Sequence, residues 1–328
     1  MMRRSLASAS SVIILFALAA CGSGDTSGGG PRRFVNIGSA PPGGAFFVIG
    51  SALGEVLNKH QADANWSVTS EATQGSMENI RRLHAGQLDF ALSNAAITYF
   101  AVRGEGDWNQ PYPMRTVMTL APNVGLFLTT KNSGVKSLAD LKGERVVLGP
   151  PGAGMDYFLR PILEAHGVTY DDITPLNANQ DISVGMVGDG SAAAAFLGGA
   201  VPTASITQAS SSLDVYFIPF TDEAKQNLIE NYPFFSPATI PAETYRNQEE
   251  AFEGLNVGAM HLITSADADE ELVYQVTKTL YENREEVVEK HAAGRAINAA
   301  NVIRNTGTEF HPGAIRYYRE IGIWPEDE

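Results

Sequence analysis

Residues 34–60, FVNIGSAPPGGAFFVIGSALGEVLNKH, decide the fold because they place a strand, a glycine turn and a helix one after another. The stretch 34–40 is apolar and β-rich. In 45–60 the apolar residues recur at spacings of three to four, which predicts an amphipathic helix. These residues are Phe46, Ile49, Leu53 and Leu57. A strand that continues into a helix through a short turn is the repeating unit of an α/β fold.

The rest of the chain repeats this unit, which predicts an α/β fold with mainly parallel sheets. A second helix is expected at 76–85, and helical sequence from residue 267 onward is expected to return to the first domain. Pro122 and Asn123 interrupt the long apolar stretch 116–130. The other expected strands are 34–40, 66–73, 90–94, 145–149, 173–177, 192–197, 215–219 and, after the proline-rich segment 232–241, 257–264.

The folded part of the chain is about 298 residues long, from residue 31 to residue 328, and exceeds what one hydrophobic core usually serves. We therefore expect two α/β domains, the first built from 32–122 and 247–328 and the second from 123–246. Two chain crossings between them would form a hinge beside a cleft. Interdomain clefts are a preferred place for small ligands.

The first 24 residues, MMRRSLASASSVIILFALAACGSG, predict export to a periplasmic or extracytoplasmic location. Their apolar run is far shorter than the about 20 residues of a membrane-spanning helix, so 1–20 are expected to be a cleaved signal peptide. Leu-Ala-Ala before Cys21 resembles the lipobox of bacterial lipoproteins, which implies a lipid on Cys21 that anchors the chain to a bacterial membrane. Residues 21–31 would be the lipidated cysteine and a flexible tether. The alternative is an unmodified cysteine behind an ordinary signal peptide.

The chain is acidic, with a net charge of −14. Removing 1–20 takes away Arg3 and Arg4 and leaves 21 Lys and Arg against 37 Asp and Glu, a net charge of −16. Such a chain repels nucleic acid, so no nucleic-acid partner is expected. Cys21 is the only cysteine, which excludes an internal disulfide, and a monomer is expected.

Three glycine-containing segments each follow an expected strand and open an expected helix: 39–47 (SAPPGGAFF), 73–79 (TQGSMEN) and 149–156 (GPPGAGMD). This arrangement points free backbone N–H groups and the positive end of a helix dipole at an anion. Any one of the three is equally well explained as a helix cap. Three of them at matching places in two domains favour a shared carboxylate-binding cleft.

Other chemistries lack their motifs. The sequence contains no GxxxxGK[ST], and no glycine segment completes GxGxxG, so nucleotide binding has little support. The six histidines show no metal-ligand spacing, and the serines lack a Gly-x-Ser-x-Gly elbow. We therefore expect no metal, no cofactor and no enzymatic activity.

Five segments together resemble the TAXI group of solute receptors, which serve tripartite ATP-independent (TRAP) transporters. They are IGSAPPGGAFFVIGSALGEVLNKH from Ile37, TQGSMENIRRLHAGQLDFAL from Thr73, SGVKSLADLKGERVVLGPPGAGMD from Ser133, YPFFSPATIPAETY from Tyr232 and HPGAIRYYREIG from His311. The resemblance covers nearly the whole mature chain. It implies a type II periplasmic binding protein fold that captures a small organic acid or amino acid such as glutamate and delivers it to a permease driven by an ion gradient.

The resemblance also implies a set of ligand-contacting residues, carried over position by position. The first domain would supply Ser39, Gly43, Gly44, Phe46, Phe47, Gln74, Gly75, Ser76 and Asn94. The second domain would supply Gly152, Gly154, Met155, Asp156, Pro202, Thr203 and Phe235.

The chain departs from the family at several of these positions. Met155 stands where a threonine is usual, Thr203 where an asparagine is usual, and Phe46-Phe47 where the family commonly has two tyrosines. Several hydroxyl groups have therefore gone from the expected pocket, and a site built to bond ligand hydroxyls or amines rejects ligands that lack them. The converse predicts a carboxylate whose body is more apolar than glutamate, although glutamate and related dicarboxylates stay open.

Some alternatives remain open at this point. Phe46 is equally a core residue, while Phe47 leans toward the ligand. Arg160 either binds a ligand carboxylate or, more in keeping with its spacing, pairs with Asp156 one helical turn away. The rival functions are a receptor of an ABC importer or of a sensory system, and an enzyme built on the same fold.

Overall fold

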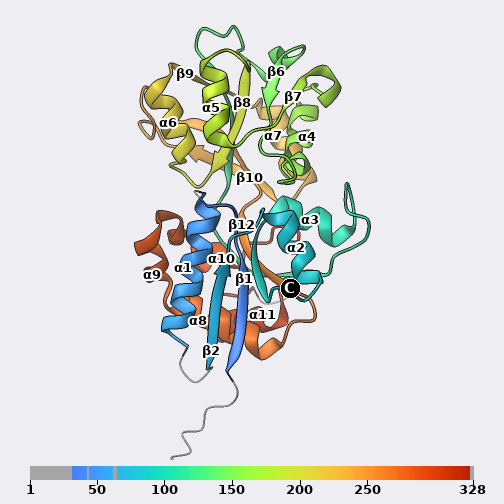
Figure 1. Ribbon diagram of the computed structural model, residues 1–328, viewed down its shortest axis with the longest axis vertical. Helices are drawn as coiled ribbons and strands as arrows, with labels where there is room; N and C mark the ends of the chain where they lie inside the picture. The colour runs from blue at the N-terminus through green and yellow to red at the C-terminus, as the bar shows by residue number, and fades with distance from the viewer. Residues whose placement is uncertain (1–31, 43, 62–64, 326–328) are drawn as a thin grey trace, which may run out of the picture.

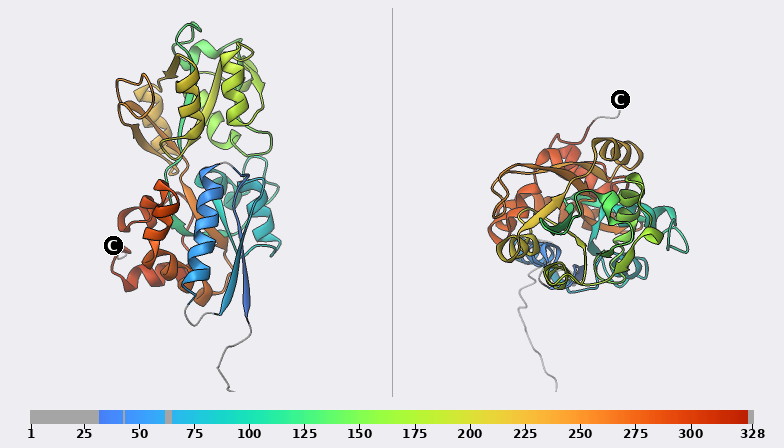
Figure 2. Two further views of the ribbon diagram at one scale, coloured as in Figure 1. Left: turned by 60° about the vertical axis from the view of Figure 1, so that its left-hand side comes forward. Right: turned by 90° about the horizontal axis from the view of Figure 1, so that it is seen from above.

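The computed structural model describes residues 32–42, 44–61 and 65–325, and these form two α/β lobes stacked along the long axis of the molecule (Figure 1). We call them the first and second domains, because the chain begins in one, passes through the other and returns. Figure 2 shows that the two lobes meet at a narrow waist, with the C-terminal helices packed on the first domain. Two domains on either side of a hinge confirm the predicted class of fold.

The first domain is built on a five-stranded sheet in the order β2-β1-β3-β12-β4. Strand β1 runs parallel to β2 and β3, whereas β12 runs antiparallel to β3 and β4. The strands are β1 (Arg33–Gly38), β2 (Trp66–Glu71), β3 (Phe90–Asn94), β4 (Met114–Thr119) and β12 (Met260–Ser265). The helices are α1 (Ala45–Lys59), α2 (Ser76–His84), α3 (Ala95–Arg103), α8 (Glu270–Glu282), α9 (Arg284–Lys290), η4 (Ala292–Ala296), α10 (Ala299–Val302) and α11 (Pro312–Glu320).

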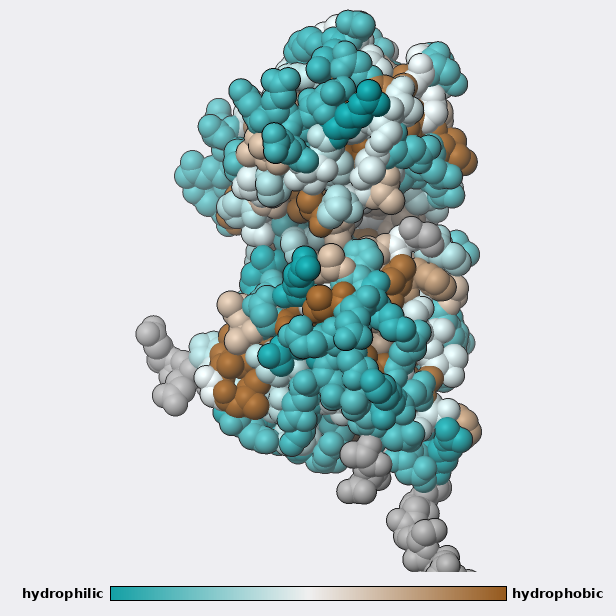
Figure 3. All heavy atoms as spheres, turned by 90° about the vertical axis from the view of Figure 1, so that its left-hand side faces the viewer, coloured by the Kyte–Doolittle hydropathy of each residue, from teal (hydrophilic) through white to brown (hydrophobic). Residues whose placement is uncertain are grey.

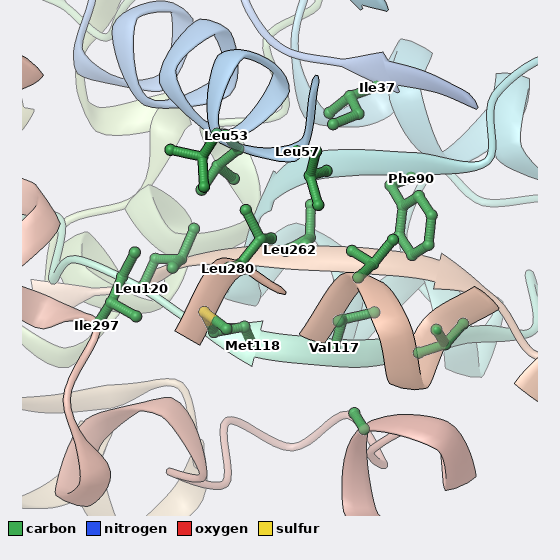
Figure 4. Packing of buried hydrophobic residues seen from close by; sticks show 14 of the residues in the cluster. Ile37, Leu53, Leu57, Phe90, Val117, Met118, Leu120, Leu262, Leu280 and Ile297 are labelled. Atoms are coloured by element: carbon green, nitrogen blue, oxygen red, sulfur yellow. The ribbon is translucent and has the colours of Figure 1, made fainter. Parts of the chain in front are cut away.

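The core of the first domain confirms that the C-terminal helices return to it. Figure 4 shows Leu53 and Leu57 of α1 facing Leu262 of β12 and Leu280 of α8, and all four side chains are fully buried. Each such side chain contributes about 2 kcal/mol of hydrophobic stabilisation. The apolar stripe read from the sequence is therefore the face on which the two ends of the chain meet.

The second domain is built on a mixed sheet in the order β10-β11-β5-β8-β6-β7, with β9 also paired to β5. Its strands are β5 (Val124–Thr130), β6 (Arg145–Val147), β7 (Thr174–Leu176), β8 (Ala194–Gly199), β9 (Val215–Ile218), β10 (Phe235–Ile240) and β11 (Phe252–Val257). Its helices are η2 (Leu138–Leu141), α4 (Asp156–Ala165), η3 (Tyr170–Asp172), α5 (Gln180–Gly188), α6 (Ala204–Ser212) and α7 (Asp222–Asn231).

The prediction of mainly parallel sheets is wrong. Strand β5 runs antiparallel to β8, β9 and β11, and β12 runs antiparallel to both of its neighbours. The reason is that the chain enters the second domain through β5 and leaves it through β11. Each crossing therefore carries a strand whose direction opposes the βαβ units around it.

The return crossing lies later in the chain than residue 246, where the sequence placed the domain boundary. Strand β11 pairs with β10 and β5, so the second sheet continues to Val257. Strand β10 was not predicted because its segment is rich in proline. Pro237 is tolerated there because β10 is an edge strand of the sheet, where a missing N–H breaks no ladder on the open side.

The two crossing segments form a hydrogen-bonded ribbon between the domains. Val257 N donates to Asn123 O at 2.8 Å, Met260 N donates to Ala121 O at 2.9 Å, and Leu120 N donates to Met260 O at 2.8 Å. This ribbon is the hinge. Its two covalent connections join the domains and are hydrogen-bonded to each other.

Beside the hinge, His261 is fully buried on β12, and its Nε2 lies 2.8 Å from Thr98 Oγ1 on α3. Its Nδ1 has no hydrogen-bond partner within the described chain. Burial lowers the pKa of His261 to about 3, because the charged ring has lost its hydration.

This buried histidine should make stability depend on pH. Between about pH 6.5 and about pH 3 the unfolded chain binds a proton that the folded chain does not, so stability falls as the pH falls. We expect the side chain alone to remove about 2 kcal/mol of unfolding free energy between about pH 7 and about pH 5.

The measurement is the free energy of unfolding in urea for the wild type, H261Q and H84Q, where His84 is an exposed control. H261Q should lose this part of the pH dependence, and H84Q should keep it. Equal pH dependence in all three proteins would contradict the assignment.

Candidate functional site

The candidate site is the cleft between the domains. Figure 3 shows the surface hollowed between the two lobes on one side of the molecule. Two cavities have walls from both domains. We call them the glycine-loop cavity, of about 360 Å³, and the Arg304 cavity, of about 340 Å³.

The glycine-loop cavity contains four of the residues predicted to contact a ligand, Gly152, Gly154, Met155 and Asp156. The first domain contributes α2 and the segment after α3. The other lining residues are Met77, Arg81, Asp107, Leu148, Pro150, Tyr157 and Asn177. The third glycine segment therefore does face the opposite domain, as the sequence predicted.

Gly154 marks the closest approach of the third glycine segment to the first domain. Its backbone has a φ of +79°, and a Cβ atom there would lie 3.0 Å from Met77 Cγ and 3.0 Å from Ile97 Cδ1. A larger residue at this position would be strained by its positive φ and would crowd the side chains of Met77 and Ile97. Glycine is required here by contact between the domains.

An aromatic cluster holds this side of the cleft together. Tyr157 of α4 packs into the first domain, with its ring centroid 5.2 Å from Phe100 of α3, and its hydroxyl accepts a hydrogen bond from Asp107 N at 3.0 Å. Phe100 also lies 5.9 Å from the ring of Phe234. Aromatic pairs at these distances contribute about 1 kcal/mol each beyond the area they bury. The domains are thus joined by packing as well as by the hinge.

In the first glycine segment, the serine side chain bonds the backbone of strand β2. Ser39 is fully buried, and its hydroxyl donates to Glu71 O at 2.6 Å. Gly44 is exposed and precedes α1, Phe46 packs against the first core, and Phe47 is half-buried. Gly43 lies outside the described residues, as does Cys21. Of the two alternatives for Phe46, a core residue or a ligand contact, the structure supports the core residue.

The second glycine segment is tied to the end of β3. Ser76 Oγ accepts a hydrogen bond from Asn94 N at 2.9 Å, and Gly75 N donates to Thr73 Oγ1 at 3.2 Å. Gln74 is exposed, and its backbone N–H donates to Glu78 Oε2 at 2.8 Å. Of this segment's predicted contacts, Gln74 has the most solvent-accessible side chain.

Asn94 is a hinge residue. Its side-chain Oδ1 accepts from Ala96 N at 2.9 Å and so caps α3, while its Nδ2 donates to Gly258 O at 2.8 Å. Both ends of the amide are therefore used inside the protein, in a side chain that is 5% exposed. Asn94 connects the first domain to the return crossing.

The remaining predicted contacts lie on the second domain. Val201–Pro202 is a cis peptide bond, and Thr203 N donates to Tyr245 OH at 2.8 Å. Pro202 is exposed, whereas Phe235 is buried in the core beside Phe234, with ring centroids 4.7 Å apart. Phe235 therefore supports the cleft wall from inside.

Arg160 does not pair directly with Asp156. Its guanidinium lies over the ring of Tyr170, 4.0 Å from the centroid, and the Tyr170 hydroxyl donates to Asp156 Oδ1 at 2.5 Å. The tyrosine stands between the two charged residues. This arrangement is a surface contact on α4.

Four helices that begin at the cleft have no side-chain cap within the described chain, whereas Asn94 caps α3. The four are α1, α2, α4 and α6, whereas Thr221, Asp269 and His311 cap α7, α8 and α11. First-turn N–H groups of an uncapped helix attract an anion. The cleft therefore combines several positive helix ends, and anion binding by the glycine segments stays a prediction.

The Arg304 cavity was missed by the sequence analysis. It lies on the hinge, between the first crossing, the start of α6, strand β10 and the short helix η4. Its lining residues are Ala121, Pro122, Val124, Ala200, Val201, Ser236, Pro237, Ala238, Thr239, Asn256, Ala292, Ala293, Ala296 and Arg304. These residues come from distant parts of the chain and share no local pattern, so no sequence motif predicts the cavity.

Two other features, a metal site and a membrane-spanning helix, have requirements that the described part of the chain does not meet. Within it, no group of three or more His, Cys, Asp or Glu residues is placed to hold a metal ion. No helix among the described residues has both the length and the apolar character needed to cross a membrane.

Solved structures with a similar fold include several solute-binding proteins. PhnD1 from Prochlorococcus marinus, in complex with methylphosphonate, is 11% identical, with 88% of this chain and 96% of that chain covered and a TM-score of 0.54. The alkanesulfonate-binding protein SsuA from Xanthomonas axonopodis, bound to MOPS, is 14% identical over 88% and 91%, with a TM-score of 0.50. A putative periplasmic sulfonate-binding protein of an ABC transporter, SsuA from Methylobacillus flagellatus, is 14% identical over 89% and 88%, with a TM-score of 0.50.

At these identities the likeness defines the fold: two mixed α/β domains of the periplasmic binding protein type. The chain belongs to the NMT1-like family, which matches residues 37–322.

The hinge turn gives a prediction for Gly258. Its φ is +108°, and a Cβ atom there would lie 2.3 Å from Asn94 Oδ1 and 2.9 Å from Ala96 N. G258A should therefore break the cap of α3 and the tie to the hinge, at a cost of at least about 3 kcal/mol.

The matched control is G143A. Gly143 also has a positive φ, +83°, but a Cβ atom there meets nothing within 4 Å. We expect G143A to lose about 1 kcal/mol from backbone strain alone. Urea unfolding compares the two variants, and equal losses would show that the contact with Asn94 does not matter.

Proposed function

We propose that this chain is an extracytoplasmic solute receptor that captures a small organic acid in the interdomain cleft and acts by binding alone. The observation that carries the proposal is that both cavities have walls from both domains. A ligand in either cavity would contact the two domains at once. Such a ligand stabilises the arrangement in which the domains are close, because only that arrangement offers all the contacts.

The chemistry of the cleft favours an acid. Uncapped helix starts at α1, α2, α4 and α6 offer backbone donors, and the lining of the Arg304 cavity is largely apolar. Small-molecule sites commonly combine apolar walls with a few placed polar groups. The similar structures are described as binding proteins for sulfonate and methylphosphonate, which are also organic anions.

The proposed partner is a membrane permease of the TRAP type. This rests on the resemblance of the five quoted segments to TAXI receptors, and the proposed anchor is a lipid on Cys21. A second candidate is the receptor of an ABC importer, favoured by the similarity to a sulfonate-binding protein of an ABC transporter. Purification of the tagged protein from its native membrane, with identification of the bound permease, separates the two.

The binding proposal is tested by a thermal-shift screen of the purified protein with amino acids, dicarboxylates, 2-oxoacids and branched or aromatic acids. A ligand at about a hundred times its Kd adds about 2.7 kcal/mol to the unfolding free energy, which raises the melting temperature visibly. We expect branched or aromatic monocarboxylates to outrank glutamate.

A clear preference for glutamate would overturn the apolar-ligand part of the proposal. The absence of any shift, in protein shown to be free of carried-over ligand, would overturn the solute-receptor function itself.

A further inference from the structure

Arg304 lies at the hinge, and part of its guanidinium group has no hydrogen-bond partner in the described chain. Its backbone carbonyl accepts a hydrogen bond from Thr119 Oγ1 at 2.9 Å, which fixes the residue beside the end of β4. Its Nη1 lies 3.5 Å from Ser236 Oγ, at the limit of hydrogen-bond length. Its Nη2 is buried and has no hydrogen-bond partner in the described chain.

Such a guanidinium is costly without an anion. A buried charged group needs a partner of opposite charge or a full set of hydrogen bonds. The Arg304 cavity has no Asp or Glu among its lining residues, which all come from the described chain. Burial lowers the pKa of Arg304, as expected for a cation that has lost water and gained no carboxylate. The cation is thus left available to an anion from outside the protein.

Two further polar side chains accompany Arg304 in the cavity. Asn256 is 1% exposed; its Oδ1 accepts from Asn123 N at 2.9 Å, and its Nδ2 donates to Ser236 Oγ at 3.1 Å. Ser236 therefore stands between the amide and the guanidinium. Together the three groups form a polar corner at the hinge, with Arg304 from the first domain and the other two from the second.

The remaining wall of the cavity is small and apolar. Apart from Thr239 it consists of alanine, proline and valine side chains from the hinge, α6, β10 and η4. A cation in one corner of an apolar cavity fits an amphipathic anion whose acid group meets the corner and whose carbon chain lies on the alanines. An ammonium group would find no carboxylate there.

We propose that the Arg304 cavity binds the acid group of an organic monoanion that carries no amino group, with Arg304 as the anchoring cation and Ser236 and Asn256 at its side. This rests on the proposed solute-receptor function and adds the place and the charge of the ligand. A guanidinium binds a carboxylate or a sulfonate through two parallel hydrogen bonds. Because the corner is built from both domains, the bound acid would link them at the hinge.

The test uses the full chain and a pair of probes with one carbon skeleton, 4-methylpentanoate and leucine, together with the matching branched sulfonate. Titration calorimetry is performed on the wild type, R304Q, R304K and R295Q. Arg295 is the matched control, since it is exposed in the neighbouring helix η4 and does not line the cavity. We expect 4-methylpentanoate or its sulfonate counterpart to bind the wild type and leucine to bind more weakly.

R304Q should raise the Kd about 10- to 100-fold, because a charged hydrogen-bond partner is lost, and R304K should fall between R304Q and the wild type. R295Q should stay within about twofold of the wild type. Comparison of the carboxylate probe with the sulfonate probe shows whether the cavity prefers a planar or a tetrahedral acid group. A preference for either one supports the site.

The failures are separable. Equal binding by R304Q and the wild type, or a preference for leucine, would overturn this inference and leave the receptor function standing. Absence of binding by every probe in the wild type would also overturn this inference, whereas the receptor function falls only if the thermal-shift screen finds no ligand either. If R304Q is poorly folded by circular dichroism, A292F serves instead, since Ala292 is an exposed lining residue and a phenyl group there narrows the cavity with Arg304 intact.

Discussion

The structure depends on the pairing of two chain crossings at the waist. Hydrogen bonds between Leu120, Ala121 and Asn123 on one crossing and Val257 and Met260 on the other make a short ribbon out of two separate connections. A single connection would let the domains swivel, but a paired ribbon restricts them to rotation about itself. Asn94 then fixes the ribbon to the first domain by bonding Gly258 O with one end of its amide and capping α3 with the other. The cleft has a defined shape because this constraint leaves little freedom.

The two sides of the hinge differ in how the domains meet. On the side of α3, the rings of Phe100, Tyr157 and Phe234 pack across the boundary, and apolar contact of this kind stabilises close approach without any ligand. On the side of Arg304, the boundary contains small apolar residues and a cation whose Nη2 has no partner among the described residues. Under the proposal, a bound anion would supply the missing contact. A receptor that must respond to its ligand needs such a boundary, because tight packing on both sides would close it permanently.

Local pattern was enough to predict the elements and insufficient to predict the site. The strand 90–94, the helix from Ala45 and the class of fold followed from periodicity, since burial on one face imposes a spacing that a sequence must show. The antiparallel strands escaped prediction because strand direction is set by the path between domains. Ser39 and Asn94 were expected as ligand contacts because the family resemblance implies them, and in the structure their side chains bond the backbone of neighbouring segments. The Arg304 cavity left no trace in the sequence, because its polar corner joins residues 236, 256 and 304, which no spacing rule connects.

Because the chain as a whole is negatively charged, the few positive groups in the cleft matter for any anion that enters it. The chain has a net charge of −14 and repels an approaching anion, but at physiological salt that repulsion is screened beyond about 8 Å. Inside the cleft, the groups next to a ligand outweigh more distant charges, because the Coulomb interaction weakens with distance and salt screens it further. Uncapped helix ends and the guanidinium of Arg304 therefore determine the sign of the field that a ligand meets after it enters. Under the proposed function, selection of an anion therefore depends on a few donors in the cleft, because the overall charge of the chain is negative.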